Sequence, residues 1–258
     1  MFHGLEGSSQ SHYIRACAQV AHAAGWQVAV PHFRGCSGEL NRLPRAYHSG
    51  DHEEIDWILR RLRLTHSRLH VSGVSLGGNA LLRWAQETGR QADQVVRSIA
   101  AVCAPTDLAA SGHAMGSGFN RWTYTPMFLR TMKRRAAQMW QRHPGLFDRA
   151  TLQRASTLYE FDNVFTAPLH GFANTEDYWR RASAKPGLRD IACPSLIIHA
   201  RNDPFIPPHS WPQADQVGPS VLLCQTETGG HVGYLQGPPP GDLRALPEYL
   251  MQWWRLHP

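Results

Sequence analysis

Short apolar runs alternate with helix-length segments along most of this chain. The strand-like runs lie at residues 26–31, 69–74, 95–103, 194–200 and 220–226. The segments with a helical spacing of apolar residues lie at 11–25, 50–64, 76–89 and 243–256. A strand followed by a helical connection favours parallel strands with helices on both faces of the sheet. The pattern therefore predicts an α/β fold built on a mostly parallel sheet.

The alternation breaks once, between residues 108 and 190. This segment is rich in Trp, Tyr, Phe, Met and Arg and holds 12 Lys and Arg against 6 Asp and Glu, so it carries the whole net charge of +6. We expect it to be a helical cap inserted into a sheet domain formed by residues 1–107 and 191–258. The local excess of positive charge favours an anionic ligand or surface near the cap, although a solvated helix face would explain it equally well.

Composition excludes several classes of protein. No apolar run approaches the roughly 18 residues of a membrane span, and the first residues lack a signal-peptide pattern, so we expect a cytoplasmic protein. The five cysteines form no CxxC pair, which disfavours disulfides and zinc, and nothing points to another metal or a cofactor. Nucleic-acid binding would rest on the pI of about 9.3 alone, without a motif, so no nucleic-acid partner is expected. The oligomeric state stays open.

The stretch "HVSGVSLGGN" at residues 70–79 places Ser75 between two glycines, after a strand-like run and before a helix-like segment. This is the strand–turn–helix setting of a nucleophile elbow. Gly73 and Gly77 allow a sharp turn without Cβ clashes, and the amide of Leu76 would face an oxyanion formed at the serine. The bare GxSxG pattern is weak, and an ordinary serine in a tight turn is the alternative.

A serine becomes a nucleophile when a histidine takes its proton and a carboxylate orients that histidine. Asp203 follows the strand-like run at 194–200, and His231 follows the last run in a glycine-rich loop. Loops after parallel strands converge on one crevice, so Ser75, Asp203 and His231 are predicted to form a catalytic triad. Asp107 also follows a strand-like run and is the second candidate for the acid.

Other polar residues have structural explanations beside functional ones. His48, Asp51 and His52 resemble metal ligands in their spacing, but Ser49 or Asp51 capping a helix is the stronger interpretation. His199 lies inside a strand-like run, where packing in the core is expected. Near the N-terminus, "FHGLEGSS" at residues 2–9 would supply a second oxyanion donor, the amide of Leu5, unless it is only a flexible start.

Seven motifs follow one another in a fixed order: "FHGLEGS", "FRGCSGELN", "HSGD", "GVSLGGN", "EFDNVFTAPLHGF", "ARNDPF" and "GGHVGY". Together they resemble the YheT-like branch of the α/β-hydrolase family, over essentially the whole chain. The resemblance implies an eight-stranded, mostly parallel sheet with a cap after the sixth strand, and carboxylesterase-type chemistry on acyl esters. It places the triad on Ser75, Asp203 and His231 and the oxyanion donors on Leu5 and Leu76.

The N-terminus departs from the family. Members carry two edge strands ahead of the HGLEG loop and then the strand that enters it, of which only Met1 and Phe2 are present here. That strand would lie between the runs at 26–31 and 69–74. Two residues cannot satisfy the ladder of a central strand, so we expect the chain starting at Met1 to be poorly soluble or inactive unless it is extended upstream.

The cap segment "PMFLRTMKRRAAQMW" is apolar on one side and basic on the other. It would form an acyl slot while its cations face a phosphate or carboxylate, or it would simply pack against the sheet domain. These cations are Arg130, Lys133, Arg134 and Arg135. The sequence thus favours a serine esterase or lipase acting on small-molecule acyl esters of medium or longer chains, with peripheral membrane contact through the basic cap. The alternatives are an acyltransferase with the same triad and a non-catalytic ligand-binding member of the fold.

Overall fold

The computed structural model describes residues 1–258 and contains one four-stranded parallel sheet, which confirms the predicted α/β class. Each strand pairs with the next along the chain, in the order β1-β2-β3-β4. The strands are β1 (His70–Val74), β2 (Ser98–Val102), β3 (Ser195–Ala200) and β4 (Val221–Thr226). All four fall within the runs that the sequence predicted.

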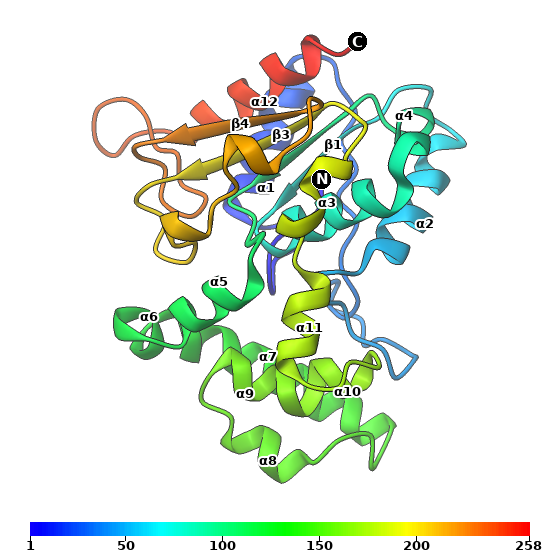
Figure 1. Cartoon of the computed structure of the whole chain (residues 1–258), viewed down its shortest axis with the longest axis vertical. Coiled ribbons are helices and arrows are strands. Elements are labelled where there is room, and N and C mark those ends of the chain that lie inside the picture. The colour runs from blue at the N-terminus through cyan, green and yellow to red at the C-terminus, as the bar shows by residue number, and fades with distance from the viewer.

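Helices cover both faces of this sheet (Figure 1). On one face lie α2 (His52–Arg63), α3 (Leu76–Thr88) and α4 (Ala92–Val95); on the other lie α1 (His12–Ala23) and α12 (Ala245–Arg255). Alternate strand residues face opposite sides, so Ile197 packs toward α3 and Ile198 toward α12. The four predicted helices are thereby confirmed, and the sheet is buried on both faces.

All elements between β2 and β3 except one turn are α- or π-helical, and they lie together below the sheet in Figure 1. They are α5 (Leu108–Met115), α6 (Gly118–Trp122), α7 (Tyr124–Arg142), α8 (Arg149–Arg154), α9 (Leu158–Phe161), the π-helix η2 (Asp162–Thr166), α10 (Ala167–Leu169) and α11 (Thr175–Ala182). Short 3₁₀ turns are η1 (Gly89–Gln91), η3 (Lys185–Asp190), η4 (Pro208–Ser210) and η5 (Ala214–Gln216). We propose that residues 108–190 form an inserted cap and use that name below.

The strand predicted at residues 26–31 is not formed, and the eight strands implied by the family resemblance are four here. Met1 and Phe2 do lie between this segment and β1. The Met1 ammonium donates to the Ala29 carbonyl oxygen at 2.7 Å, and Phe2 forms a parallel bridge with Gly73. Since two residues offer too few donors and acceptors for a ladder, the 26–31 segment has no continuous hydrogen-bonded neighbour.

No helix of the protein combines the length and the apolar character that crossing a bilayer requires.

Candidate active site

Ser75 lies at a sharp turn between β1 and α3. Its φ and ψ are 54° and −122°, a conformation that residues with a Cβ seldom adopt. Its amide donates to the Val102 carbonyl oxygen of β2 at 2.8 Å. A Cβ added to Gly73 would lie 2.3 Å from the Gly77 oxygen, and one added to Gly77 would lie 2.5 Å from the His3 oxygen. The turn therefore needs both glycines, because backbone passes too close for a side chain.

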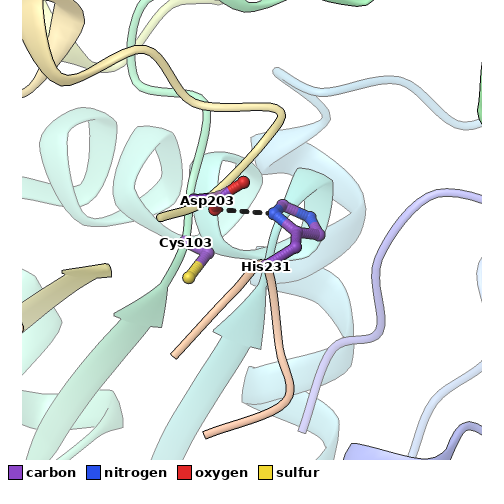
Figure 2. A group of neighbouring side chains, drawn as sticks. All are labelled: Cys103, Asp203 and His231. Carbon is purple, nitrogen blue, oxygen red and sulfur yellow. Dashed lines mark hydrogen bonds and ion pairs between the residues drawn. The ribbon is translucent and has the colours of Figure 1, made fainter. Parts of the chain in front are cut away.

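Asp203 and His231 meet beyond the ends of β3 and β4. The Nδ1 atom of His231 lies 2.8 Å from Asp203 Oδ2, and the carboxylate is fully buried (Figure 2). The other carboxylate oxygen accepts a hydrogen bond from the Phe205 amide at 2.8 Å. The side-chain oxygen of Asn202 accepts from the Gly230 amide, which ties the two loops together. A buried carboxylate placed in this way fixes both the orientation and the tautomer of the histidine.

Ser75 and His231 line the same cavity, which has a volume of about 1020 Å³. The Ser75 hydroxyl and the His231 ring make no hydrogen bond in this structure. Such contacts are often long without substrate and shorten in the reacting complex. The centre of the Phe205 ring lies 4.5 Å from that of His231, and the same ring contacts Tyr124 and Phe128 of α7. The structure thus pairs Asp203 with His231 and places Ser75 at the cavity that His231 lines.

Leu5 and Leu76 also line this cavity, and their amides have no acceptor within the chain. The amides on either side of Leu5 are engaged. Gly4 donates to the Tyr13 hydroxyl and Glu6 to the Tyr47 hydroxyl, each at 2.9 Å. The Leu5 amide thus stays free between two bound neighbours at the cavity that Ser75 also lines, where it could hold a negative oxygen.

Buried His3 fixes the start of this loop. Its Nε2 accepts from the Phe33 amide at 3.1 Å, and its Nδ1 donates to the Gly4 carbonyl oxygen at 2.8 Å. Burial lowers the pKa of His3 to about 4, so the ring is neutral at pH 7 and makes both contacts as one tautomer. The His3 ring therefore connects the start of the Leu5 loop to the backbone at Phe33 through hydrogen bonds.

The alternative site residues have other partners. Asp107 caps α5 by accepting from the Ala110 amide at 3.0 Å, and it makes no hydrogen bond to His231. Asp51 precedes α2, but its carboxylate pairs with Arg45 at 2.5 Å and does not cap the helix, contrary to the capping interpretation. His199 is buried and stacks on Trp211, with ring centroids 5.4 Å apart.

Three residues whose side chains could ligate a metal lie together in the structure, and two of them are Asp203 and His231. Ligand atoms of Cys103, Asp203 and His231 all lie within 4.8 Å of one another (Figure 2). Burial raises the pKa of the Cys103 thiol well above its ordinary value, and its sulfur lies 3.2 Å from the Tyr234 hydroxyl. Both carboxylate oxygens of Asp203 are already engaged, one with His231 and the other with the Phe205 amide. The group therefore suits a supported acid–histidine pair better than a metal centre.

Two of the cap cations do not face an open anion site, so that prediction is wrong for them. Arg135 lies 3.2 Å from the Glu6 carboxylate, and the Lys133 ammonium donates to the Gln153 carbonyl oxygen at 2.8 Å. Arg130 and Arg134 are exposed and form no ion pair. The acidic partner of Arg135 comes from a loop about 130 positions earlier in the chain, a distance over which helical periodicity carries no information.

Sequence reasoning missed Tyr13, Tyr47 and Asn202, which hold the Leu5 and His231 loops. A single tyrosine in a sequence carries no signal for such a role, because the partner lies far away along the chain. Asn202 stands directly before the predicted acid, and this adjacency was the one available hint.

The chain matches the family model described as "alpha/beta hydrolase fold" over residues 1–238. It belongs to that family, and within it the chain is YheT-like. It is 41% identical over 241 residues to YheT, a candidate esterase of Escherichia coli (strain K12), an alignment that covers 92% of this chain and 70% of YheT.

One further relative and one solved structure are also similar to this chain. The "Medium-chain fatty acid ethyl ester synthase/esterase 2" of Saccharomyces cerevisiae is 29% identical over 265 residues, covering 91% of this chain and 57% of the yeast protein. The solved structure of the Pyrococcus furiosus esterase Pf2001 superposes with a TM-score of 0.58 at 16% identity, over 99% of this chain and 78% of that chain, which shows the fold alone. This chain spans little more than half the length of the yeast relative. The family and its esterase members support hydrolase activity.

Proposed function

We propose that this protein is a serine hydrolase of the carboxylesterase or lipase type. The observation that carries the proposal is the buried Asp203–His231 pair, 2.8 Å apart, at the cavity that the strained Ser75 also lines. Unpaired amides at Leu5 and Leu76 add an oxyanion hole. Each part has one role in acyl transfer, and together they supply every group that ester cleavage needs.

In the proposed reaction the Ser75 oxygen attacks the ester carbonyl while His231 Nε2 takes the serine proton. The carbonyl oxygen becomes negative and is held by the Leu5 and Leu76 amides, and Asp203 stabilises the resulting imidazolium. The imidazolium gives its proton to the departing alcohol, which leaves an acyl-enzyme. Water then attacks the acyl carbon, His231 takes the water proton, and the acid is released with the serine restored.

The lining of the cavity supports esters of apolar acids. Methionine and aromatic side chains from the cap face the space above Ser75, including Met115, Met127, Phe128 and Met132. Unbranched, flexible methionines adapt to acyl chains of several lengths. We therefore propose acyl esters of medium or longer chains as substrates, in line with the name of the yeast relative.

A fluorophosphonate probe and a Ser75→Ala variant test the proposal. The probe should label the wild-type protein and not the variant, and hydrolysis of a p-nitrophenyl ester should fall by about 10⁴-fold or more. The variant must unfold at the wild-type urea concentration, which controls for misfolding. Near-normal turnover by a folded Ser75→Ala protein would overturn the mechanism.

Acyl transfer is the second candidate, because the yeast relative is named both a synthase and an esterase. The acyl-enzyme would be the same, and an alcohol would replace water in its breakdown. Products formed from one ester with and without added ethanol distinguish the two activities: transfer yields the ethyl ester, and hydrolysis yields the free acid. If the protein binds esters without any turnover, it is a non-catalytic member of the fold.

The mouth of the cavity supports contact with an anionic lipid surface. Phe119 and Trp122 of α6 are 72% and 79% exposed, and Met127 and Leu235 are exposed while also lining the cavity. An aromatic series joins this rim to the site, since Tyr124 contacts both Phe119 and Phe205. The cap also carries all the excess positive charge of the chain. We propose that this rim, and not Lys133 or Arg135, meets the lipid.

Sedimentation with vesicles of phosphatidylglycerol and phosphatidylcholine tests the rim. Trp122→Ser should lower binding several-fold, and binding should fall as salt shortens the Debye length below about 8 Å. Trp57→Ser is a matched control, because Trp57 is an exposed tryptophan on α2 that is likewise covered by an arginine, Arg61. Equal losses of vesicle binding in both variants would refute a specific role of the rim.

All five cysteines are unpaired, which supports a reducing, cytoplasmic location as part of the proposal.

A further inference from the structure

The turn that carries the Leu5 amide contains a residue in an unfavourable conformation. The Gly7 amide donates to the Gly4 carbonyl oxygen at 3.0 Å and closes a β-turn with Leu5 and Glu6 at its centre. Glu6 has a φ of 57°, at a position where such turns normally use glycine. A residue with a side chain is strained there, so the side chain must make contacts that hold it.

The Glu6 carboxylate makes two such contacts. One oxygen accepts a hydrogen bond from the Tyr47 hydroxyl at 2.8 Å, and the same hydroxyl accepts from the Glu6 amide at 2.9 Å. The other oxygen lies 3.2 Å from Arg135 Nε on α7, in an ion pair whose carboxylate is 8% exposed. Side chain and backbone of Glu6 are thus held by one tyrosine, and the cap supplies the counter-charge.

This arrangement places a carboxylate one residue from the proposed oxyanion donor. An unneutralised carboxylate would oppose the negative charge that forms on the substrate oxygen, and its effect would be strong because this carboxylate is buried and poorly screened by water. The Arg135 guanidinium cancels that charge. Its other contact, with the Cys36 sulfur at 2.6 Å, adds no second anion, because burial raises the pKa of this thiol and keeps it protonated.

We propose that Glu6 and Arg135 are positioning residues of the oxyanion hole: Glu6 locks the turn that aims the Leu5 amide, and Arg135 neutralises the locking carboxylate. The oxyanion hole is then complete only when α7 lies against the Leu5 turn, so the cap contributes to catalysis as well as to substrate binding. This inference rests on the proposed serine hydrolase mechanism.

A double-mutant cycle on a water-soluble p-nitrophenyl ester tests the inference. Arg135→Gln should lower kcat by about 10-fold to 100-fold and leave KM within about 2-fold, because only the transition state carries the oxyanion. Glu6→Gln keeps an oxygen that can accept from Tyr47, and it should cost about 10-fold or less. The kcat of the double variant should be at least about 3-fold higher than that of Arg135→Gln, since the carboxylate that opposed the oxyanion is gone.

Two controls separate this role from simple support of the fold. Arg134→Gln removes the same charge from an exposed, unpaired position on the same helix and should leave kcat within about 2-fold. If Arg135→Gln unfolds, Arg135→Lys keeps the charge and should keep most of kcat. The inference would be overturned if the kcat losses of the two single variants multiply in the double variant, or if a folded Arg135→Gln protein keeps the wild-type kcat. Activity in Ser75→Ala would instead overturn the mechanism itself, so the two failures are distinguishable.

Discussion

Replacing Gly77 with alanine tests how tightly the elbow and the Leu5 loop are held together. The new Cβ would lie 2.5 Å from the His3 carbonyl oxygen and 2.9 Å from that of Phe2. Ordinary van der Waals contact begins at 3.4 Å, so the His3 backbone must retreat by roughly 0.9 Å. Both obstacles are backbone atoms and cannot rotate away.

This retreat should reach the oxyanion site. The Leu5 amide follows His3 by two residues, and the His3 ring is bound to Phe33 and Gly4, so the loop moves as a unit. A misplacement of about 1 Å in a catalytic group costs about 10²-fold in rate, which corresponds to about 2.7 kcal/mol in the activation free energy. Crowding should also lower the free energy of unfolding by about 1–3 kcal/mol.

The assay is kcat and KM on a soluble ester together with urea unfolding of Gly77→Ala. Gly116→Ala is the control, since its Cβ would meet its nearest atoms at an ordinary 3.5 Å. We expect kcat to fall about 100-fold in the first variant and to stay near the wild-type value in the second. A Gly77→Ala protein with wild-type kcat and stability would show that the Leu5 loop is not pressed against the elbow.

Two further predictions concern buried polar groups. Asp203→Asn should reduce kcat by about 10⁴-fold by presenting the wrong histidine tautomer. Asp107→Asn should change kcat and stability little, because Asn caps a helix about as well as Asp; the reverse ranking would move the acid to Asp107. Burial lowers the pKa of His199 to about 4, and neither ring nitrogen has a hydrogen-bond partner. Between about pH 6.5 and pH 4 only the unfolded chain therefore takes up a proton at this histidine. The free energy of unfolding should decrease as the pH is lowered through this range. His199→Phe should therefore lose about 2 kcal/mol less than the wild type in free energy of unfolding between pH 7 and pH 5, and an equal loss in both proteins by urea titration would contradict this explanation.

The parts of the fold that the sequence predicts correctly are those specified by the residues of the segment itself. Strands β1 to β4 and helices α1, α2, α3 and α12 follow from apolar periodicity, and glycines mark the turn at Ser75. The segment at 26–31 has the same apolar character as the true strands, and it fails because strand pairing depends on a neighbour elsewhere in the chain. Expected solubility or activity of this chain stays a prediction.

The candidate site shows the same division. The sequence predicts Ser75, Asp203 and His231 as site residues because each follows an apolar run, and parallel strands end at one edge of the sheet. The amphipathic pattern of its helix predicts an external anion for Arg135, whereas its partner in the structure is Glu6 of the N-terminal loop. Contacts between distant segments decide which charges are free, and periodicity within one helix cannot reveal them.

Strands β2 and β3 are hydrogen-bonded neighbours, yet the chain leaves the sheet after Val102 and returns only at Ser195. The entropy lost in closing such an excursion grows with the logarithm of its length, so even doubling these roughly 90 residues would cost only about 0.6 kcal/mol. Insertions and deletions in this excursion are therefore cheap for the sheet, whose register is set by the strands themselves. The cap side of the cavity at Ser75, and with it the range of ligands that fit there, can therefore change in evolution almost independently of the sheet.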